Sequence, residues 1–274
     1  MKSPLPVAKR GSAVASEFER RASRADALAR ESAAGAEPLR FAAGLYRAQG
    51  RLAAELDAAH AEEPLSGHAD RDADRVRQRA EPLVRFAAES GPERLAGEAR
   101  ARLEDSAATA CTRLVVYWSG DRGTGEDYLS RAILRPYVEV LRALNRPPDR
   151  IHRNGRCPFC GGAPWVAARR EGSLMEGARR LLACALCGVE WPFGRILCPS
   201  CLEQDPVKLP SFSSQTHPTV RIEACETCRR YVKSLDLSED ARPIPEVDDL
   251  VSLSMDLWAR EQGYERIEPG IAGF

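Results

Sequence analysis

The sequence predicts an α+β protein: an N-terminal all-α helical bundle, then two tandem rubredoxin-like or zinc-ribbon modules, then a C-terminal helix. Residues 1–150 are rich in Ala, Arg, Glu and Leu, which favour helices. Eight of the nine cysteines lie between residues 157 and 228, where helical periodicity fades. The predicted domains are a helical bundle, a first metal module, a second metal module and an acidic tail, over residues 1–150, 151–192, 193–233 and 234–274.

The N-terminal half carries apolar residues at helical spacing. Within residues 37–56, Leu39, Ala43 and Tyr46 share one face, and similar patterns run through residues 72–89, 93–118 and 126–145. Segments that contain glycine separate these patterns. We therefore expect a bundle of about five helices, with a kink at Pro136.

The cysteine-rich half carries short apolar runs that indicate two β-hairpins. The first pairs Trp165–Arg169 with Arg179–Ala183, and the second pairs Val207–Phe212 with Val220–Ala224. The tail, residues 234–274, has a formal charge of −7 but also carries apolar residues at helical spacing. We expect its helix to end near Gly263 and to dock on the helical domain.

Four C-x-x-C pairs give the sequence its strongest signal. They recur with a period of 41 residues, and flanking residues repeat as well, so this region is a tandem repeat. The pairs are Cys157 with Cys160, Cys184 with Cys187, Cys198 with Cys201, and Cys225 with Cys228.

This spacing is typical of metal ligands. Two intervening residues let the chain turn so that both thiolates face one ion, and two such turns complete a tetrahedral four-sulfur site. The 23 residues between the pairs of each repeat leave room for one hairpin. We predict two four-cysteine sites, each with one metal ion, from these sets: Cys157, Cys160, Cys184 and Cys187; and Cys198, Cys201, Cys225 and Cys228.

Two other arrangements of the cysteines are less favoured. Pairing Cys184 and Cys187 with Cys198 and Cys201 leaves a linker of only ten residues and breaks the repeat. Thioredoxin-like redox dithiols need one pair at the start of a helix, not four pairs in register. Iron and zinc both suit tetrahedral sulfur sites. The ninth cysteine, Cys111, is expected to be a small buried residue of a helix.

Composition and motifs restrict the function. The 40 basic residues balance the 40 acidic ones, and no apolar run approaches the roughly 20 residues that span a bilayer. The first residues lack the apolar core of a secretory signal, so we expect a cytoplasmic protein without membrane insertion. No catalytic triad, phosphate-binding glycine loop or nucleotide motif is present, which predicts that the protein is not an enzyme.

Three classes of function remain. A zinc-ribbon nucleic-acid-binding protein needs a basic surface, yet residues 151–233 carry 12 basic and 7 acidic residues, and two thiolate–metal sites reduce this surplus to about +1. A rubredoxin-like electron carrier needs iron and a reversible redox couple. A maturation factor would use the metal modules to shape a surface for a protein partner.

The cysteine region resembles the FdhE family of formate dehydrogenase accessory proteins. The resemblance rests on residues 157–166, 177–201, 221–240 and 247–264, and more loosely on residues 38–49 and 129–137. All eight paired cysteines match the family's pairs, whereas Gly188 stands where many members carry an acid and the N-terminal half diverges.

The resemblance implies a cytoplasmic accessory protein that binds the catalytic subunit of respiratory formate dehydrogenase. That enzyme contains molybdenum and iron–sulfur centres and is exported by the twin-arginine route. The accessory protein supports its activity and does not itself oxidise formate. The family's rubredoxin-like sites hold iron, which places iron ahead of zinc. We hypothesise that both halves clamp the immature subunit until its cofactors are in place.

Overall fold

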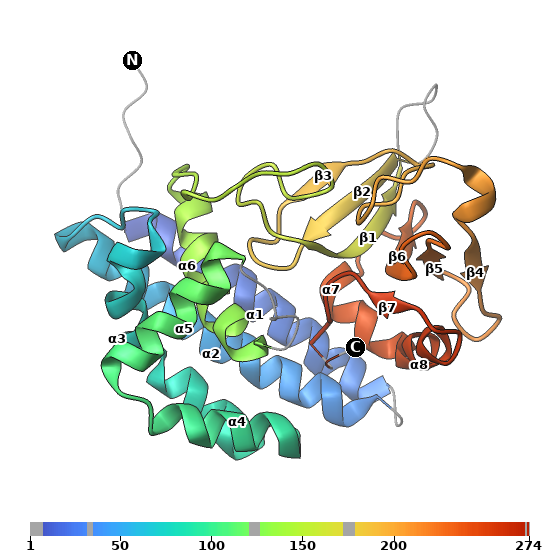
Figure 1. The fold of residues 1–274 in the computed structure, drawn as a ribbon. Coiled ribbons are helices and arrows are strands. Elements are labelled where there is room, and N and C mark those ends of the chain that lie inside the picture. The colour runs from blue at the N-terminus through green and yellow to red at the C-terminus, as the bar shows by residue number, and fades with distance from the viewer. Residues whose placement is uncertain (1–7, 32–34, 121–126, 172–178, 272, 274) are drawn as a thin grey trace. The chain divides into compact units, whose positions relative to one another are not determined.

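A computed structural model describes residues 8–31, 35–120, 127–171, 179–271 and 273 (Figure 1). The chain divides into two compact units. The first comprises residues 1–27 and 40–150, and the second comprises residues 28–39 and 151–274. Among the residues that the structure describes, no helix combines the length and apolar character that a membrane crossing requires.

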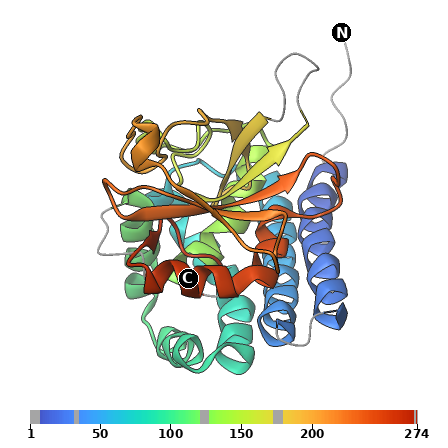
Figure 2. The ribbon, with the colours of Figure 1, turned by 90° about the vertical axis from the view of Figure 1, so that its right-hand side faces the viewer.

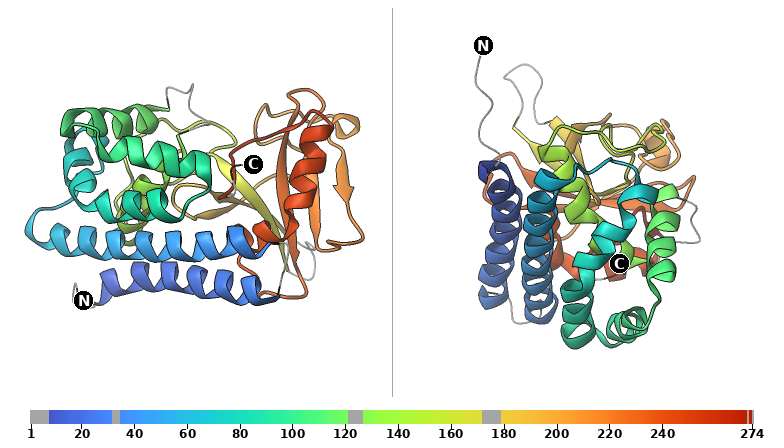
Figure 3. Two further views of the ribbon diagram at one scale, coloured as in Figure 1. Left: turned by 90° about the horizontal axis from the view of Figure 1, so that it is seen from below. Right: turned by 90° about the vertical axis from the view of Figure 1, so that its left-hand side faces the viewer.

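The described residues of the N-terminal half form six helices, and α1 and α2 lie side by side in Figure 3. In chain order the helices are α1 (Ala8–Glu31), α2 (Ala36–Glu62), α3 (Ala69–Ser90), α4 (Glu93–Leu103), α5 (Ala107–Ser119) and α6 (Tyr128–Ala143). The sequence predicts about five helices, because its pattern over residues 93–118 is unbroken. The structure divides this stretch at Ser106, whose side chain accepts a hydrogen bond from the Thr109 amide and caps α5.

Pro136 lies inside α6 and leaves the carbonyl of Ala132 without its helical amide partner. The Gln49 side chain donates a hydrogen bond to that carbonyl at 2.8 Å. Both groups are buried, so a side chain from α2 compensates for the missing backbone bond. The proline is thereby accommodated within a helix that continues to Ala143.

The first unit has an apolar core that encloses one charged cluster. Phe18 of α1 contacts Tyr46 of α2, with ring centroids 6.5 Å apart, and both side chains are almost fully buried. Beside them, Glu139 of α6 is fully buried and accepts hydrogen bonds at 2.9 Å from Arg21 and from Arg135. Because a buried carboxylate is costly without partners, this cluster fixes α1 against α6.

The second unit is built on one seven-stranded sheet, seen as a twisted layer in Figure 2. Its main strand order is β3-β2-β1-β6-β5-β4, and β7 pairs with β6. The strands are β1 (Pro164–Arg170), β2 (Arg179–Cys184), β3 (Glu190–Pro192), β4 (Ser211–Ser213), β5 (Val220–Ala224), β6 (Arg230–Leu237) and β7 (Glu265–Arg266).

The first predicted hairpin is present, and the second is shorter than predicted. Strands β1 and β2 pair antiparallel, as do β4 and β5. Residues Pro206–Lys208 form a 3-10 turn, η1, where the sequence suggests a strand. The Asp205 side chain caps this turn through the Val207 amide, and Pro206 and Pro210 donate no backbone hydrogen bonds, so only Ser211–Ser213 joins the sheet.

The two repeats share this sheet, a feature that the tandem pattern does not predict. β1 of the first repeat pairs in parallel with β6 of the second, from Val166 opposite Lys233 to Arg170 opposite Leu237. β6 also runs across the domain boundary that the sequence places after residue 233. The two metal modules therefore form one continuous layer.

The C-terminal segment comprises α7 (Pro245–Asp248), the 3-10 helix η2 (Asp249–Ser252) and α8 (Leu253–Glu261). It packs on the sheet within its own unit. Trp258 of α8 meets Phe212 of β4 edge-to-face, with ring centroids 4.8 Å apart. The docking of this segment on the helical domain stays a prediction.

A buried ionic network fastens the segment to β6. Lys233 is fully buried, and its ammonium group donates to the backbone carbonyls of Asp249 and Ser252 at 2.9 and 3.2 Å and pairs with the Asp256 carboxylate. Arg266 binds Asp249 through both terminal nitrogens, at 2.8 and 3.0 Å. Two acids and two bases thus balance one another where water is excluded.

Candidate metal centres

The first cysteine cluster lies where β1 begins and β2 ends. Cys157 and Cys160 occupy the turn before β1, while Cys184 ends β2 and Cys187 lies in the turn that follows. The sulfur atoms of Cys157 and Cys187 are 3.5 Å apart, and those of Cys160 and Cys184 are 3.4 Å apart. All four sulfurs lie within 4.8 Å of one another.

These separations match a tetrahedral metal site. A metal–sulfur bond of about 2.3 Å places tetrahedral sulfur ligands about 3.8 Å apart. The four side chains are fully buried and come from the two chain segments at the open end of one hairpin. The donor set and its spacing therefore fit one zinc or iron ion, with Cys157, Cys160, Cys184 and Cys187 as its ligands.

The burial and close spacing of these cysteines show why a cation suits the cluster. Burial raises the pKa of the Cys184 thiol, and its hydrogen bonds to neighbouring thiols raise it further. Hydrogen bonds from the thiols of Cys160, Cys184 and Cys187 hold the pKa of Cys157 low. Four thiolates buried side by side repel one another and are costly without a counter-charge, so they require a positive charge at their centre.

The second cluster repeats this geometry and is more open. The sulfur atoms of Cys198 and Cys228 are 3.7 Å apart, and those of Cys201 and Cys225 are 3.6 Å apart. Again all four sulfurs lie within 4.8 Å of one another. Cys198 and Cys225 are buried, but Cys228 is half-buried and Cys201 is exposed. The two clusters thus offer the same ligands with unequal access to solvent.

The four turns that carry the cysteines share one backbone feature, a positive φ angle at the same position. The residue after each pair has a positive φ: 66° at Gly161 and 67° at Gly188 in the first repeat, 65° at Leu202 and 55° at Arg229 in the second. The amide of each of these residues donates to the carbonyl of the first cysteine in its pair. Left-handed backbone is ordinary for glycine but costs other residues about 1–2 kcal/mol, so the second repeat holds its turns under strain.

Backbone amides also face the sulfurs. The Leu186 amide donates to Cys184 Sγ and the Ser200 amide to Cys198 Sγ, each at 3.4 Å. Such bonds stabilise thiolate ligands without adding charge. A Cβ atom at Gly162 would lie 2.7 Å from Cys184 Sγ, so the wall of the first cluster has no room for a side chain. The C-x-x-C spacing alone does not reveal this requirement.

The structure brings the eight cysteines together in the two groups that the 41-residue period predicts. The alternative grouping of Cys184 and Cys187 with Cys198 and Cys201 does not occur. None of the nine cysteines forms a disulfide. Cys111 is half-buried, not buried as predicted, and its Sγ lies 3.9 Å from an oxygen of Asp74 on α3. The residue type alone does not determine which face of the helix Cys111 occupies.

Fold and clusters together define an α+β protein with a helical N-terminal region and two four-cysteine clusters suited to metal ions. Residues 196–271 match the family model described as FdhE, C-terminal domain. The resemblance to the FdhE family that the cysteine region carries is thereby confirmed.

Two named relatives support the same conclusion. The FdhE homolog of Aquifex aeolicus is 35% identical over 118 residues, which are 43% of this chain and 41% of that protein. The homolog of Pseudomonas aeruginosa is 34% identical over 119 residues, 42% of this chain and 38% of that protein. The matched segments thus span about two fifths of the length of these relatives.

The likeness in fold extends further along the chain. The crystal structure of the FdhE protein from Pseudomonas aeruginosa has a TM-score of 0.62 to this structure, with 22% sequence identity. It covers 93% of this chain, and this chain covers 94% of it. The helical region and the sheet therefore follow a fold already seen in a solved structure.

Proposed function

We propose that this protein is a non-catalytic accessory factor that binds the catalytic subunit of respiratory formate dehydrogenase in the cytoplasm and supports its maturation. The observation that carries the proposal is the pair of four-cysteine clusters in one sheet, the second of which lies within the segment that matches the FdhE C-terminal domain. The partner and the maturation role come from the family resemblance. The sheet supplies the surface on which the subunit docks.

The metal ions serve this function by holding the surface together. Each module has about 40 residues, too few for an independent apolar core, and its cysteines lie in turns or at strand ends. A structural zinc ion contributes about 10–16 kcal/mol of apparent binding energy in small peptides. Metal binding thus folds the docking surface, with Cys157, Cys160, Cys184 and Cys187 at one ion and the other four cysteines at the second.

Iron is our first choice for the native metal, since the family's sites are rubredoxin-like, and zinc is the alternative. The exposed Cys201 favours one second candidate function, a rubredoxin-like electron carrier, because an electron partner needs a metal ligand near the surface. Such a carrier requires iron and a reversible couple. A visible spectrum recorded during reductive titration distinguishes this candidate from a purely structural role.

Affinity purification tests the proposed partner. The catalytic subunit is used as bait in cells that express the full chain, and the Cys184→Ser variant, which removes a ligand of the buried cluster, is compared with Cys111→Ser, which removes a cysteine outside both clusters. We expect wild type and Cys111→Ser to be recovered with the subunit and Cys184→Ser to be lost. Recovery of nucleic acid without any formate dehydrogenase subunit would instead favour the zinc-ribbon alternative.

A further inference from the structure

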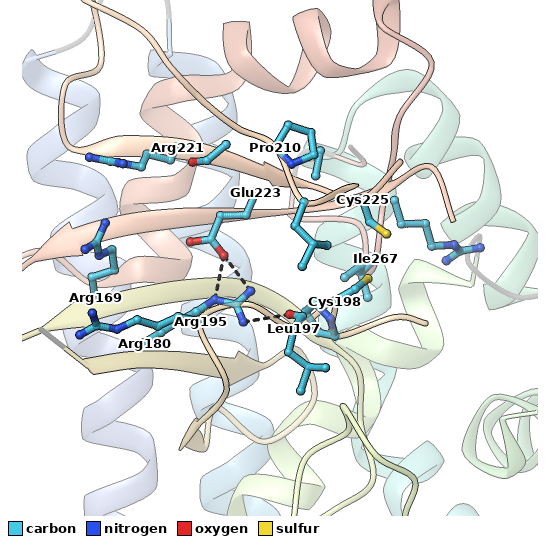
Figure 4. Close-up of a pocket in the computed structure, with 15 residues that line it drawn as sticks. Arg169, Arg180, Arg195, Leu197, Cys198, Pro210, Arg221, Glu223, Cys225 and Ile267 are labelled. Carbon is cyan, nitrogen blue, oxygen red and sulfur yellow. Dashed lines mark hydrogen bonds and ion pairs between the residues drawn. The ribbon is translucent and has the colours of Figure 1, made fainter. Parts of the chain in front are cut away.

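One cavity of the second unit is lined by an unusual number of arginines (Figure 4). It borders the second cysteine cluster, since Cys198 and Cys225 contribute to its wall, and its volume is about 210 Å³. Five guanidinium groups and one carboxylate, that of Glu223, are among its lining side chains; the arginines are Arg169, Arg180, Arg195, Arg221 and Arg230.

One arginine and the carboxylate neutralise each other and form part of the wall. Arg180 binds Glu223 through two nitrogens, at 2.7 and 2.8 Å, and donates to the Gly194 carbonyl at 2.8 Å. Figure 4 draws the two bonds to Glu223 and a longer one, at 3.4 Å, to the Leu197 carbonyl; together they use the donors of a nearly buried side chain. Arg230 also has an acidic partner, Glu265, at 3.9 Å. The positive surplus of the lining is therefore assigned to Arg169 and Arg221.

Two of these arginines are held on one face of the sheet by strand register. Arg169 lies opposite Asp236, and Arg221 lies opposite Ser234, two residues earlier on β6. Directly paired strand residues share a face, as do residues two apart on one strand. In Figure 4 the side chains of Arg169 and Arg221 lie at one end of the cavity and the two cysteines lie at the other.

The side chains of Arg169 and Arg221 have donors to spare. Arg169 is half-buried and Arg221 is exposed, and within the described part of the chain neither guanidinium makes a hydrogen bond or a close ion pair. Their charge acts on Asp236, whose pKa is lowered despite its partial burial, mainly by hydrogen bonds from Ser238 and further by these two arginines. One carboxylate does not balance two arginines, so this end of the cavity stays electropositive.

A buried hydroxyl lies on the same face. Ser234 is 1% exposed, and its Oγ has no hydrogen-bond partner among the described residues. Buried hydroxyls are ordinarily satisfied. Ser234 is not among the residues that line the cavity, so the arginines alone define the site.

We propose that this cavity is a binding site for the phosphoryl group of a small molecule, with Arg169 and Arg221 as its main ligands. The planar guanidinium fork matches the oxygens of a phosphoryl group, and the surplus of positive charge suits a dianion better than a single carboxylate. A volume of about 210 Å³ equals that of roughly seven liquid waters, enough for a phosphate with a small substituent. The concave, partly enclosed wall favours such a ligand over an extended polymer.

The test titrates inorganic phosphate and glycerol 3-phosphate into metal-loaded full chain at low ionic strength, by isothermal calorimetry. Acetate serves as the monoanion control, and metal content is checked after each titration. The variant is Arg169→Gln with Arg221→Gln, which breaks no hydrogen bond of the fold. The matched control is Arg242→Gln, which removes an arginine that is not part of the cavity lining and pairs with Asp240 on the surface.

We expect both phosphates to bind at least tenfold more tightly than acetate. The double variant should lose at least tenfold in affinity with an unchanged thermal midpoint, and Arg242→Gln should stay within twofold of wild type. Phosphate binding no tighter than acetate binding, or an equal loss in the control, would overturn the proposal. So would a single-stranded oligonucleotide or an acidic peptide that binds a hundredfold more tightly than glycerol 3-phosphate, since the cavity would then be part of a macromolecular interface.

Discussion

Replacing Lys233 by methionine tests the buried network that fastens the C-terminal segment to the sheet. The ammonium group has contacts of 2.9, 3.2 and 3.1 Å with the Asp249 carbonyl, the Ser252 carbonyl and the Asp249 carboxylate, and it also pairs with Asp256. Methionine fills a similar volume but leaves two buried carboxylates facing one arginine, Arg266. Breaking a buried ion pair on one side costs about 3–5 kcal/mol. We expect Lys233→Met to lower the free energy of unfolding by that amount.

The assay is urea denaturation of metal-loaded protein, followed by tryptophan fluorescence. Lys208→Met is the matched control, because Lys208 is half exposed and its pair with Glu203 spans 3.7 Å; we expect a loss below about 1 kcal/mol there. Adding Asp256→Asn to Lys233→Met restores the charge balance and should recover about 1–2 kcal/mol. A Lys233→Met variant as stable as Lys208→Met, or a double variant whose losses simply add, would refute the reasoning.

Three further predictions concern the metal clusters. Strong chelation should unfold the sheet while most helical circular dichroism survives; loss of all helical signal together with the sheet would contradict a two-part protein. A colorimetric chelator should remove one metal ion quickly and the other slowly, because Cys201 is exposed and the first cluster is buried, and two equal rates would count against this difference. Gly188→Ala should lower the free energy of unfolding by about 1–2 kcal/mol, because Gly188 has a left-handed backbone. The control Gly97→Ala, inside α4 with open space around it, should raise the free energy of unfolding by about 0.5–1 kcal/mol. Denaturant midpoints that shift in the same direction for both variants would argue against the proposed strain.

The cysteine grouping could be predicted from the sequence because metal ligation imposes fixed spacing. Two residues between cysteines and a period of 41 leave little freedom, and the structure brings together the same two sets. The first hairpin was predictable from its two short apolar runs, which become the largely buried strands β1 and β2. In contrast, Pro206 and Pro210 shortened the second hairpin through local turn chemistry that competes with strand propensity.

Long-range pairing was out of reach of local patterns. Nothing near Val166 or Lys233 indicates that β1 and β6 pair in parallel across the two repeats. The full burial of Lys233 depends on acids from η2 and α8, which approach only in the folded chain. The arginine cavity likewise gathers residues from several strands and loops. A net charge summed over residues 151–233 does not show such a local cluster of arginines.

Metal analysis of anaerobically purified full chain, together with its visible spectrum, tests the central claim most directly. The account predicts two metal ions per chain, falling to one when Cys198 and Cys201 are both replaced by serine, and visible absorption if the ions are iron. Wild-type protein that holds less than one ion per chain, or a double variant that retains both, would contradict the assignment of two four-cysteine metal centres.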